Sequence, residues 1–161
     1  MNIYKNDFEG LAAFSNGIRQ LTLKRLQEMP EGFENWRLNT TAMSFAHLAK
    51  HILDVDELFF SLSTTNKRIF KWEMGSEQAH FDVDETIYKS LLNTLKANGE
   101  KRHDIILEFN TVTINELIRD ERGNEMTFWW FLMHHVLEHE TYHRGQIAAY
   151  LKVLKGERSK Y

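Results

Sequence analysis

The stretch HHVLEHETYHRGQ (residues 134–146) combines the apolar pattern of a helix with a cluster of imidazoles. Four of the chain's eight histidines lie within residues 134–143. An α-helix rotates by about 100° per residue, which allows the side chains on each face to be identified. The face centred on His139 includes Phe128, Leu132, His135, Val136, His143, Gln146, Tyr150 and Val153. His139 and His143 are therefore expected to point into the protein interior, whereas His134 is expected to point into solvent.

A second helix with an inward histidine is predicted over residues 43–62, where Thr40 or Thr41 can cap its start. The face centred on His51 includes Ser44, His47, Leu48, Val55, Leu58 and Leu62. His51 therefore also points inward, near the middle of its helix. A further apolar face of this helix carries Phe45, Ile52, Phe59 and Phe60. Such a broad apolar surface indicates contact with more than one neighbour, such as a second subunit.

Two other helices are predicted, one from a cap at Asn6 to just before Pro30 and one that begins after Asp84. The inward faces expected for them are Phe8, Leu11, Phe14, Ile18, Leu21 and Leu26 in the first, and Ile87, Leu91, Leu95, Ile105, Ile106 and Phe109 in the second. Gly99 weakens the expectation that the second of these is continuous. The segment TVTINELIRDERGNEMT (residues 111–127) fits either two short strands or an irregular excursion.

Four long helices predict an all-α four-helix bundle, formed by residues 1–161 as a single domain. The histidine-rich helix is expected to begin at or just before Thr127 and to end near Leu154. The segment IFKWEMGSEQAHF (residues 69–81) predicts a long irregular connection between the second and third helices.

The composition argues against several classes of function. A net charge of -3 and scattered basic residues provide no positive surface for nucleic acid. The chain has no cysteine, so disulfides, thiolate nucleophiles and thiolate metal ligands are excluded. No apolar run is long enough to span a membrane, and the N-terminus does not resemble a secretory signal. A cytoplasmic protein is expected, and any metal must bind to nitrogen and oxygen.

Several imidazoles in one apolar interior need partners for their ring nitrogens. A divalent transition-metal ion would provide one, with His139 and His143 at i and i+4 and His51 contributed by the facing helix. Three histidines leave coordination positions open for water or substrate. His47 and His135 lie on the same faces and are alternative ligands or groups that face a substrate.

The candidates for hydrogen bonds to the outer nitrogens of the ligand histidines are Asp54 and Gln146. The ordinary alternative for each inward histidine is a core residue bonded to a nearby acceptor. A carboxylate-bridged di-iron bundle would need Glu-x-x-His pairs that face the interior. Glu100 in such a pair is expected to face solvent, and Glu140 lies about 100° away from His139. A zinc peptidase is disfavoured because a bundle provides the wrong context for the motif HETYH.

SFAHLAKHILDVDELF (residues 44–59) and HHVLEHETYHRGQI (residues 134–147) together resemble motifs of the DinB/YfiT-like superfamily of bacterial metal-binding four-helix bundles. The resemblance extends over nearly the whole chain, although residues 70–82 carry no matching feature. It implies one nickel, zinc or iron ion on His51, His139 and His143, and a homodimer. Some members of that superfamily are transferases or isomerases that use low-molecular-weight thiols such as bacillithiol or mycothiol, while many others have no known activity and are only named as hydrolases.

These observations leave three hypotheses for function. The first is a metal-dependent enzyme, a thiol-dependent S-transferase or a hydrolase, acting on a small-molecule substrate. His47, His135 and Glu138 are then the candidate proton carriers. The second is a binding or stress-associated bundle in which the ion only fastens two helices. The third is an interaction bundle without an ion.

Overall fold

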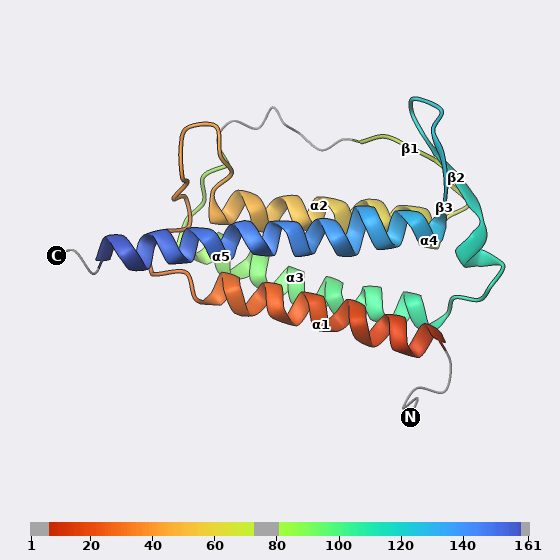
Figure 1. Ribbon diagram of the computed structural model, residues 1–161, viewed down its shortest axis with the longest axis horizontal. Coiled ribbons are helices and arrows are strands. Elements are labelled where there is room, and N and C mark those ends of the chain that lie inside the picture. Colours follow the sequence, from red (N-terminus) through yellow and green to blue (C-terminus); the bar gives the residue numbers. More distant parts are fainter. Residues whose placement is uncertain (1–6, 73–80, 159–161) are drawn as a thin grey trace.

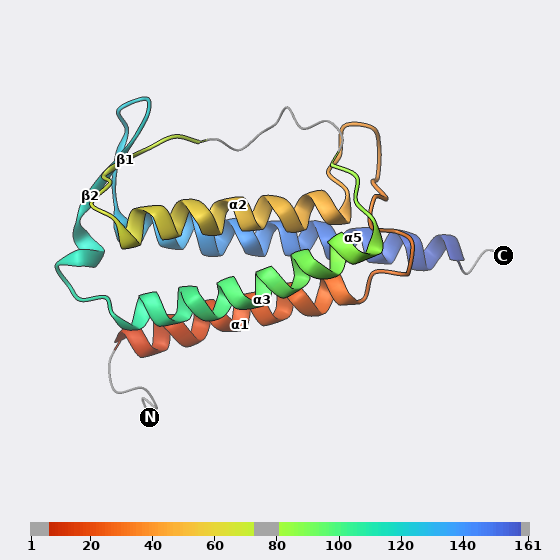
Figure 2. The same ribbon diagram turned by 180° about the vertical axis from the view of Figure 1, so that it is seen from behind.

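The helices run side by side along the long axis of the molecule, as Figure 1 and Figure 2 show from opposite sides. The computed structural model describes residues 7–72 and 81–158. The bounds of the helices are α1 Asp7–Gln27, α2 Phe45–Thr64, α3 Glu85–Leu107, α4 Phe128–Trp130, η2 Phe131–Glu138 and α5 His139–Arg158, of which the last three form one continuous run. The predicted all-α four-helix bundle is confirmed, together with its long connection between α2 and α3.

The helices begin at side chains that accept hydrogen bonds from exposed backbone N–H groups. Ser44 Oγ accepts from the N–H of the third residue after it at 3.1 Å, and Asp84 Oδ1 does the same at 2.8 Å. Thr127 Oγ1 accepts in the same way at 3.1 Å. The predicted caps at Asp84 and Thr127 are thus confirmed, whereas Thr40 or Thr41 as the cap of α2 was wrong. The predicted cap at Asn6 lies outside the described residues.

The last helical run is not a regular α-helix, because η2 is a π-helix of 8 residues. A π-helix closes i→i+5 hydrogen bonds and turns less per residue than an α-helix does. Residues on either side of η2 are therefore rotated relative to the uniform helix assumed from the sequence. The α-helical geometry resumes at His139, so the i, i+4 relation of His139 and His143 is retained.

A small sheet closes one end of the bundle (Figure 1). Its strands are β1 Ile69–Phe70, β2 Leu117–Asp120 and β3 Glu125–Thr127, in the order β1-β2-β3. β2 and β3 are antiparallel and β1 lies parallel to β2. Gly123 forms the turn between β2 and β3 with a φ of 87°, a conformation that glycine adopts without strain. Of the two alternatives left open for residues 111–127, the structure has the two short strands, and a short 3₁₀ helix, η1 Thr113–Asn115, precedes them.

The broad apolar surface of α2 is covered by the chain itself. Its aromatic and aliphatic residues are at most 3% exposed, and they are Phe45, Ile52, Phe59 and Phe60. A second subunit is therefore not needed to bury this face. Within residues 7–72 and 81–158, no helix has both the length and the apolar character required to cross a bilayer.

The inward face of α1 differs from the predicted one. Phe14 and Leu21 are 56% and 51% exposed, and Ile87 on α3 is 48% exposed. Polar side chains occupy the interior in their place, and on α1 these are Ser15, Arg19 and Thr22. Because Arg19 and Ser15 bond to side chains of other helices, α1 is rotated so that two of its large apolar residues face solvent.

Candidate metal centre

Three imidazoles from two helices meet inside the bundle. His51 extends from α2, and His139 and His143 extend from α5. The Nε2 atom of His139 lies 3.0 Å from Nε2 of His51 and 2.9 Å from Nε2 of His143. All three potential ligand atoms lie within 4.8 Å of one another. The structure thus brings together the three histidines that were selected from the sequence.

The spacing of these nitrogens suits a single transition-metal ion. Two imidazole nitrogens at about 2.0–2.1 Å from one ion lie about 2.8–3.4 Å apart when the angle between their bonds is about 90–110°. The His51–His139 and His139–His143 separations of 3.0 and 2.9 Å fall in this range, while all three ligand atoms lie within 4.8 Å of one another, so the His51 and His143 rings would close around a bound ion. An all-imidazole donor set is suited to zinc, nickel, iron or copper and unsuited to magnesium or calcium.

The surroundings keep the histidines neutral, as metal ligation requires. Burial, followed by the nearby imidazoles of His143 and His51, lowers the pKa of His139 to about 3. Burial, followed by His143, lowers the pKa of His51 to about 4. Burial also lowers the pKa of His143. Near neutral pH, each of these rings therefore retains a lone pair that can bind a cation.

Gln146 fixes the orientation of one candidate ligand. Its Oε1 lies 2.6 Å from Nδ1 of His143, so it accepts a hydrogen bond from that nitrogen and leaves the lone pair of Nε2 directed at the cluster. Asp54 instead accepts a hydrogen bond from Lys50 and affects His51 through its charge, which opposes the lowering of that pKa. Of the two candidates named for a contact with a ligand histidine, Gln146 contacts His143, and Asp54 bonds to Lys50.

The histidine cluster is buried unevenly. His143 is only 6% exposed, whereas His51 and His139 are half-buried. The Nδ1 atom of His139 is buried and, among the described residues, has no hydrogen-bond partner. One side of the cluster therefore borders the interior, while the other can be reached from solvent.

The predicted proton carriers lie outside the three-histidine group. His135 contacts Trp72, with 4.6 Å between ring centroids, and His47 lies 6.3 Å from the ring of Phe81. Glu138 is exposed and bonds to His134 at 2.7 Å. His135 also lines a hollow of about 410 Å³, together with Trp72, Asp120, Asn124 and Met126. Of the three candidates, His135 therefore has a position that a bound small molecule could reach.

A network of four buried charges lies next to the histidine cluster and was not predicted. Its members, here called the buried ion network, are Arg19, Asp56, Arg102 and Glu140. Their side chains are at most 2% exposed. Each arginine bonds to both carboxylates, at distances from 2.8 to 3.1 Å. The two positive and two negative charges balance inside the core.

Glu140 in this network follows His139 directly in the sequence. Burial alone would raise its pKa, but Arg102 and Arg19 outweigh burial and hold the pKa well below the usual range of a glutamate. Glu140 is thus an ionised partner of the two arginines. The interpretation that its Glu-x-x-His pairing is accidental agrees with this position. The sequence places these charged residues within predicted helices but carries no signal that the packing turns them inward.

Two comparisons relate the chain to known proteins. A family model described as the DinB family matches residues 5–157. Among solved structures, a DinB-like protein from Bacillus subtilis, YjoA, aligns with a TM-score of 0.67 and 20% sequence identity, over 91% of this chain and 92% of that chain. At that identity the likeness concerns the fold alone. No curated protein matches the chain. The matched residues extend from α1 into the last turn of α5.

Proposed function

The chain belongs to the DinB family, and on that premise we propose that it is a metalloenzyme with one divalent transition-metal ion on His51, His139 and His143. The observation that supports this most directly is the convergence of three neutral Nε2 atoms from two helices. Gln146, which orients one of these rings, adds a supporting contact of the kind found around metal ligands.

Nickel, zinc or iron is the ion we propose for this site. A bound ion of this kind supplies Lewis acidity, which activates either a water molecule or the sulfur of a thiol. The half-buried edges of His51 and His139 leave a side from which a small molecule can approach. The contact of His135 with Trp72 and the hollow that it lines support His135 as the group that holds the substrate or carries a proton, with His47 and Glu138 as the other candidates.

The reaction that we favour is S-transfer from a low-molecular-weight thiol to a small electrophile, with hydrolysis as the second possibility. Because the chain contains no cysteine, an attacking sulfur must come from a cosubstrate. We also propose that the protein acts in the cytoplasm as a homodimer, without binding nucleic acid or membranes. Light scattering coupled to size-exclusion chromatography tests the proposed dimer.

A non-catalytic role is the alternative, and the burial of His143 favours it. With ligands from both α2 and α5, a bound ion would fasten two helices of the bundle together. In that case the metal would contribute free energy of folding, and the protein would be a binding or stress-associated bundle without turnover.

Protein purified without a histidine tag provides the test. Elemental analysis is expected to find about one transition-metal ion per chain. The metal-loaded protein is then assayed with a panel of thiols and 1-chloro-2,4-dinitrobenzene, in which the sulfur replaces chloride on the ring, and with ester and amide substrates. Turnover that is lost in His139→Ala supports the enzyme. Stoichiometric metal without turnover supports the alternative, and absence of metal contradicts both.

A further inference from the structure

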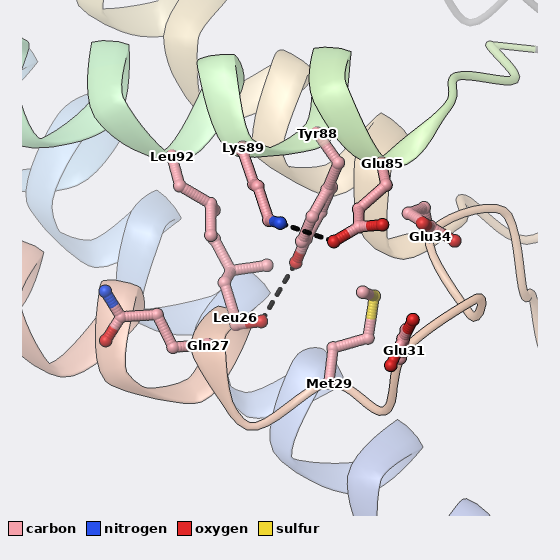
Figure 3. Close-up of a pocket in the computed structure, with 9 residues that line it drawn as sticks. All are labelled: Leu26, Gln27, Met29, Glu31, Glu34, Glu85, Tyr88, Lys89 and Leu92. Carbon is pink, nitrogen blue, oxygen red and sulfur yellow. Dashed lines mark hydrogen bonds and ion pairs between the residues drawn. The ribbon is translucent and has the colours of Figure 1, made fainter.

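A second candidate site lies apart from the histidines, between the C-terminal end of α1, the loop that follows it and the N-terminal turns of α3 (Figure 3). The pocket has a volume of about 270 Å³, which suits a small molecule better than a peptide. It is lined by Leu26, Gln27, Met29, Glu31, Glu34, Glu85, Tyr88, Lys89 and Leu92. None of the three clustered histidines lines it, so the pocket is separate from the candidate metal centre.

Glu34 is the residue that gives this pocket a chemical preference. It is only 7% exposed, and its carboxylate makes no hydrogen bond or ion pair within the described part of the chain. Its backbone carbonyl accepts a 2.9 Å hydrogen bond from the N–H of Ala46, which holds the loop in place. A carboxylate with so little contact with water and no partner in the protein is poorly compensated. A cation bound in the pocket would supply the missing partner.

The other polar groups of the pocket leave this negative charge unbalanced. Glu31 and Glu85 also line the pocket, and the one lining base, Lys89, already pairs with Glu85. The hydroxyl of Tyr88 donates a 3.0 Å hydrogen bond to the carbonyl of Leu26, which Figure 3 marks with a dashed line. Burial, followed by the charge of Glu34, raises the pKa of this hydroxyl, so Tyr88 stays neutral. No lining group is therefore free to neutralise Glu34.

The walls of the pocket indicate an organic cation. Among the described residues, the group of acidic or imidazole side chains close enough to hold a metal ion is the histidine cluster, and the three glutamates do not form such a group. The apolar side chains of Leu26, Met29 and Leu92 line the same space. We propose that this pocket binds a small organic ammonium ion, whose nitrogen pairs with Glu34 and whose hydrocarbon part contacts the apolar wall.

Hexylammonium chloride is a suitable probe, added to the uniformly ¹⁵N-labelled full chain and followed by amide chemical shifts. We expect saturable shifts confined to the amides of residues 26–34 and 85–92. Sodium hexanoate and 1-hexanol, which share the hydrocarbon part but lack the positive charge, should produce none. Equal binding of 1-hexanol would reduce the site to an apolar pocket, and absence of saturable shifts with hexylammonium would overturn the proposal.

Glu34→Gln tests the proposed contact directly. It should weaken hexylammonium binding about tenfold or more, because a charged hydrogen bond is replaced by a neutral one. The matched control Glu100→Gln, at an exposed position on α3, should bind as the unaltered protein does. Unchanged affinity in Glu34→Gln would contradict the proposal.

Two further measurements test the proposal independently of hexylammonium binding by Glu34→Gln. Without ligand, Glu34→Gln should raise the midpoint of thermal unfolding, since it removes an unpartnered buried charge. A lowered midpoint would mean that Glu34 already has a partner and would contradict the proposal. Glu85→Gln removes the partner of Lys89 and leaves its ammonium group free at the pocket. This variant should therefore also bind hexylammonium more weakly. Undiminished affinity of Glu85→Gln for hexylammonium would contradict the proposal.

Discussion

Two polar groups lie side by side in the core of this protein, and they differ in how their bonding needs are met. The buried ion network contains both signs of charge, and each arginine bonds to both carboxylates. The histidine cluster contains three like groups whose nitrogens face one another. His139 and Glu140, adjacent in the sequence, belong one to each group.

This difference separates a structural group from a binding site. Buried charges that pair with one another compensate each other, although Asp56 Oδ2 has no hydrogen-bond partner among the described residues, and removing one of them leaves the others without compensation. Where three neutral imidazoles converge, an N–H of one ring can face the lone pair of another, but the Nε2 atom of His139 cannot fully satisfy both of its neighbours. The network is therefore expected to stabilise the protein by itself, whereas the cluster should do so only when a cation is present.

Arg102→Met tests the first half of this comparison and should have the largest effect. It leaves Asp56 and Glu140 with a single arginine between them, which should lower the free energy of unfolding of the metal-free protein by about 3–5 kcal/mol. Urea denaturation measures the change. In the control Arg25→Met, which breaks an exposed pair with Glu28, the loss should stay below about 1 kcal/mol. Similar losses in the two variants would mean that burial of the network contributes nothing.

His139→Ala tests the second half. It should abolish stoichiometric metal binding and the stabilisation that metal provides, which amounts to about 2.7 kcal/mol when free metal is one hundred times its dissociation constant. Thermal unfolding with and without added metal, together with elemental analysis, measures both. His134→Ala should retain both properties, because that side chain bonds to Glu138 at the surface. Equal metal content in the two variants would be incompatible with the site.

Gln146→Leu examines the contact that orients His143. Without the acceptor at Nδ1 the ring is no longer held with its Nε2 lone pair toward the cluster, so metal affinity should fall about 10- to 100-fold. Competition with a coloured chelator measures the affinity. Gln146→Glu keeps an acceptor at the same position and should retain the affinity of the unaltered protein. If both variants bind metal equally weakly, the role of Gln146 is not to accept this hydrogen bond.

The histidine cluster could be predicted from the sequence, and the ion network could not, for a physical reason. An apolar stripe with the period of a helix identifies its inward face, and His51, His139 and His143 lie on such stripes. Arg19 and Glu140 are charged, so the same criterion places them at the surface. Their inward position depends on partners supplied by three other helices, which a pattern within one helix does not contain.

The errors on α1 have the same origin. Phe14 and Leu21 fit the apolar period, yet the bundle turns the face with Arg19 inward and leaves both of them exposed. The wrong cap of α2 has a different origin, because the position of a cap depends on local backbone geometry. Thr40 and Thr41 have side chains suitable for a cap, but the capping residue is Ser44, four and three residues after them.

At Gly99 on α3, the buried ion network leaves little room for a side chain. Substitution of Gly99 should give the smallest change in stability among these predictions. A Cβ atom at Gly99 would lie 2.6 Å from Cγ of Arg19, whose guanidinium is held by four hydrogen bonds. Gly99→Ala gains about 1 kcal/mol of helix propensity but forces this side chain aside at about 1–3 kcal/mol, for a net loss near 1 kcal/mol.

Gly17→Ala is the matched control for this substitution. A Cβ atom there would meet nothing within 4 Å, so the gain in helix propensity should appear undiminished and the protein should become more stable. Opposite signs of the two changes in urea denaturation would show that the network confines α3 to glycine at this position. A stabilising Gly99→Ala would mean that Arg19 can move without loss, and the network would then be looser than its hydrogen bonds indicate.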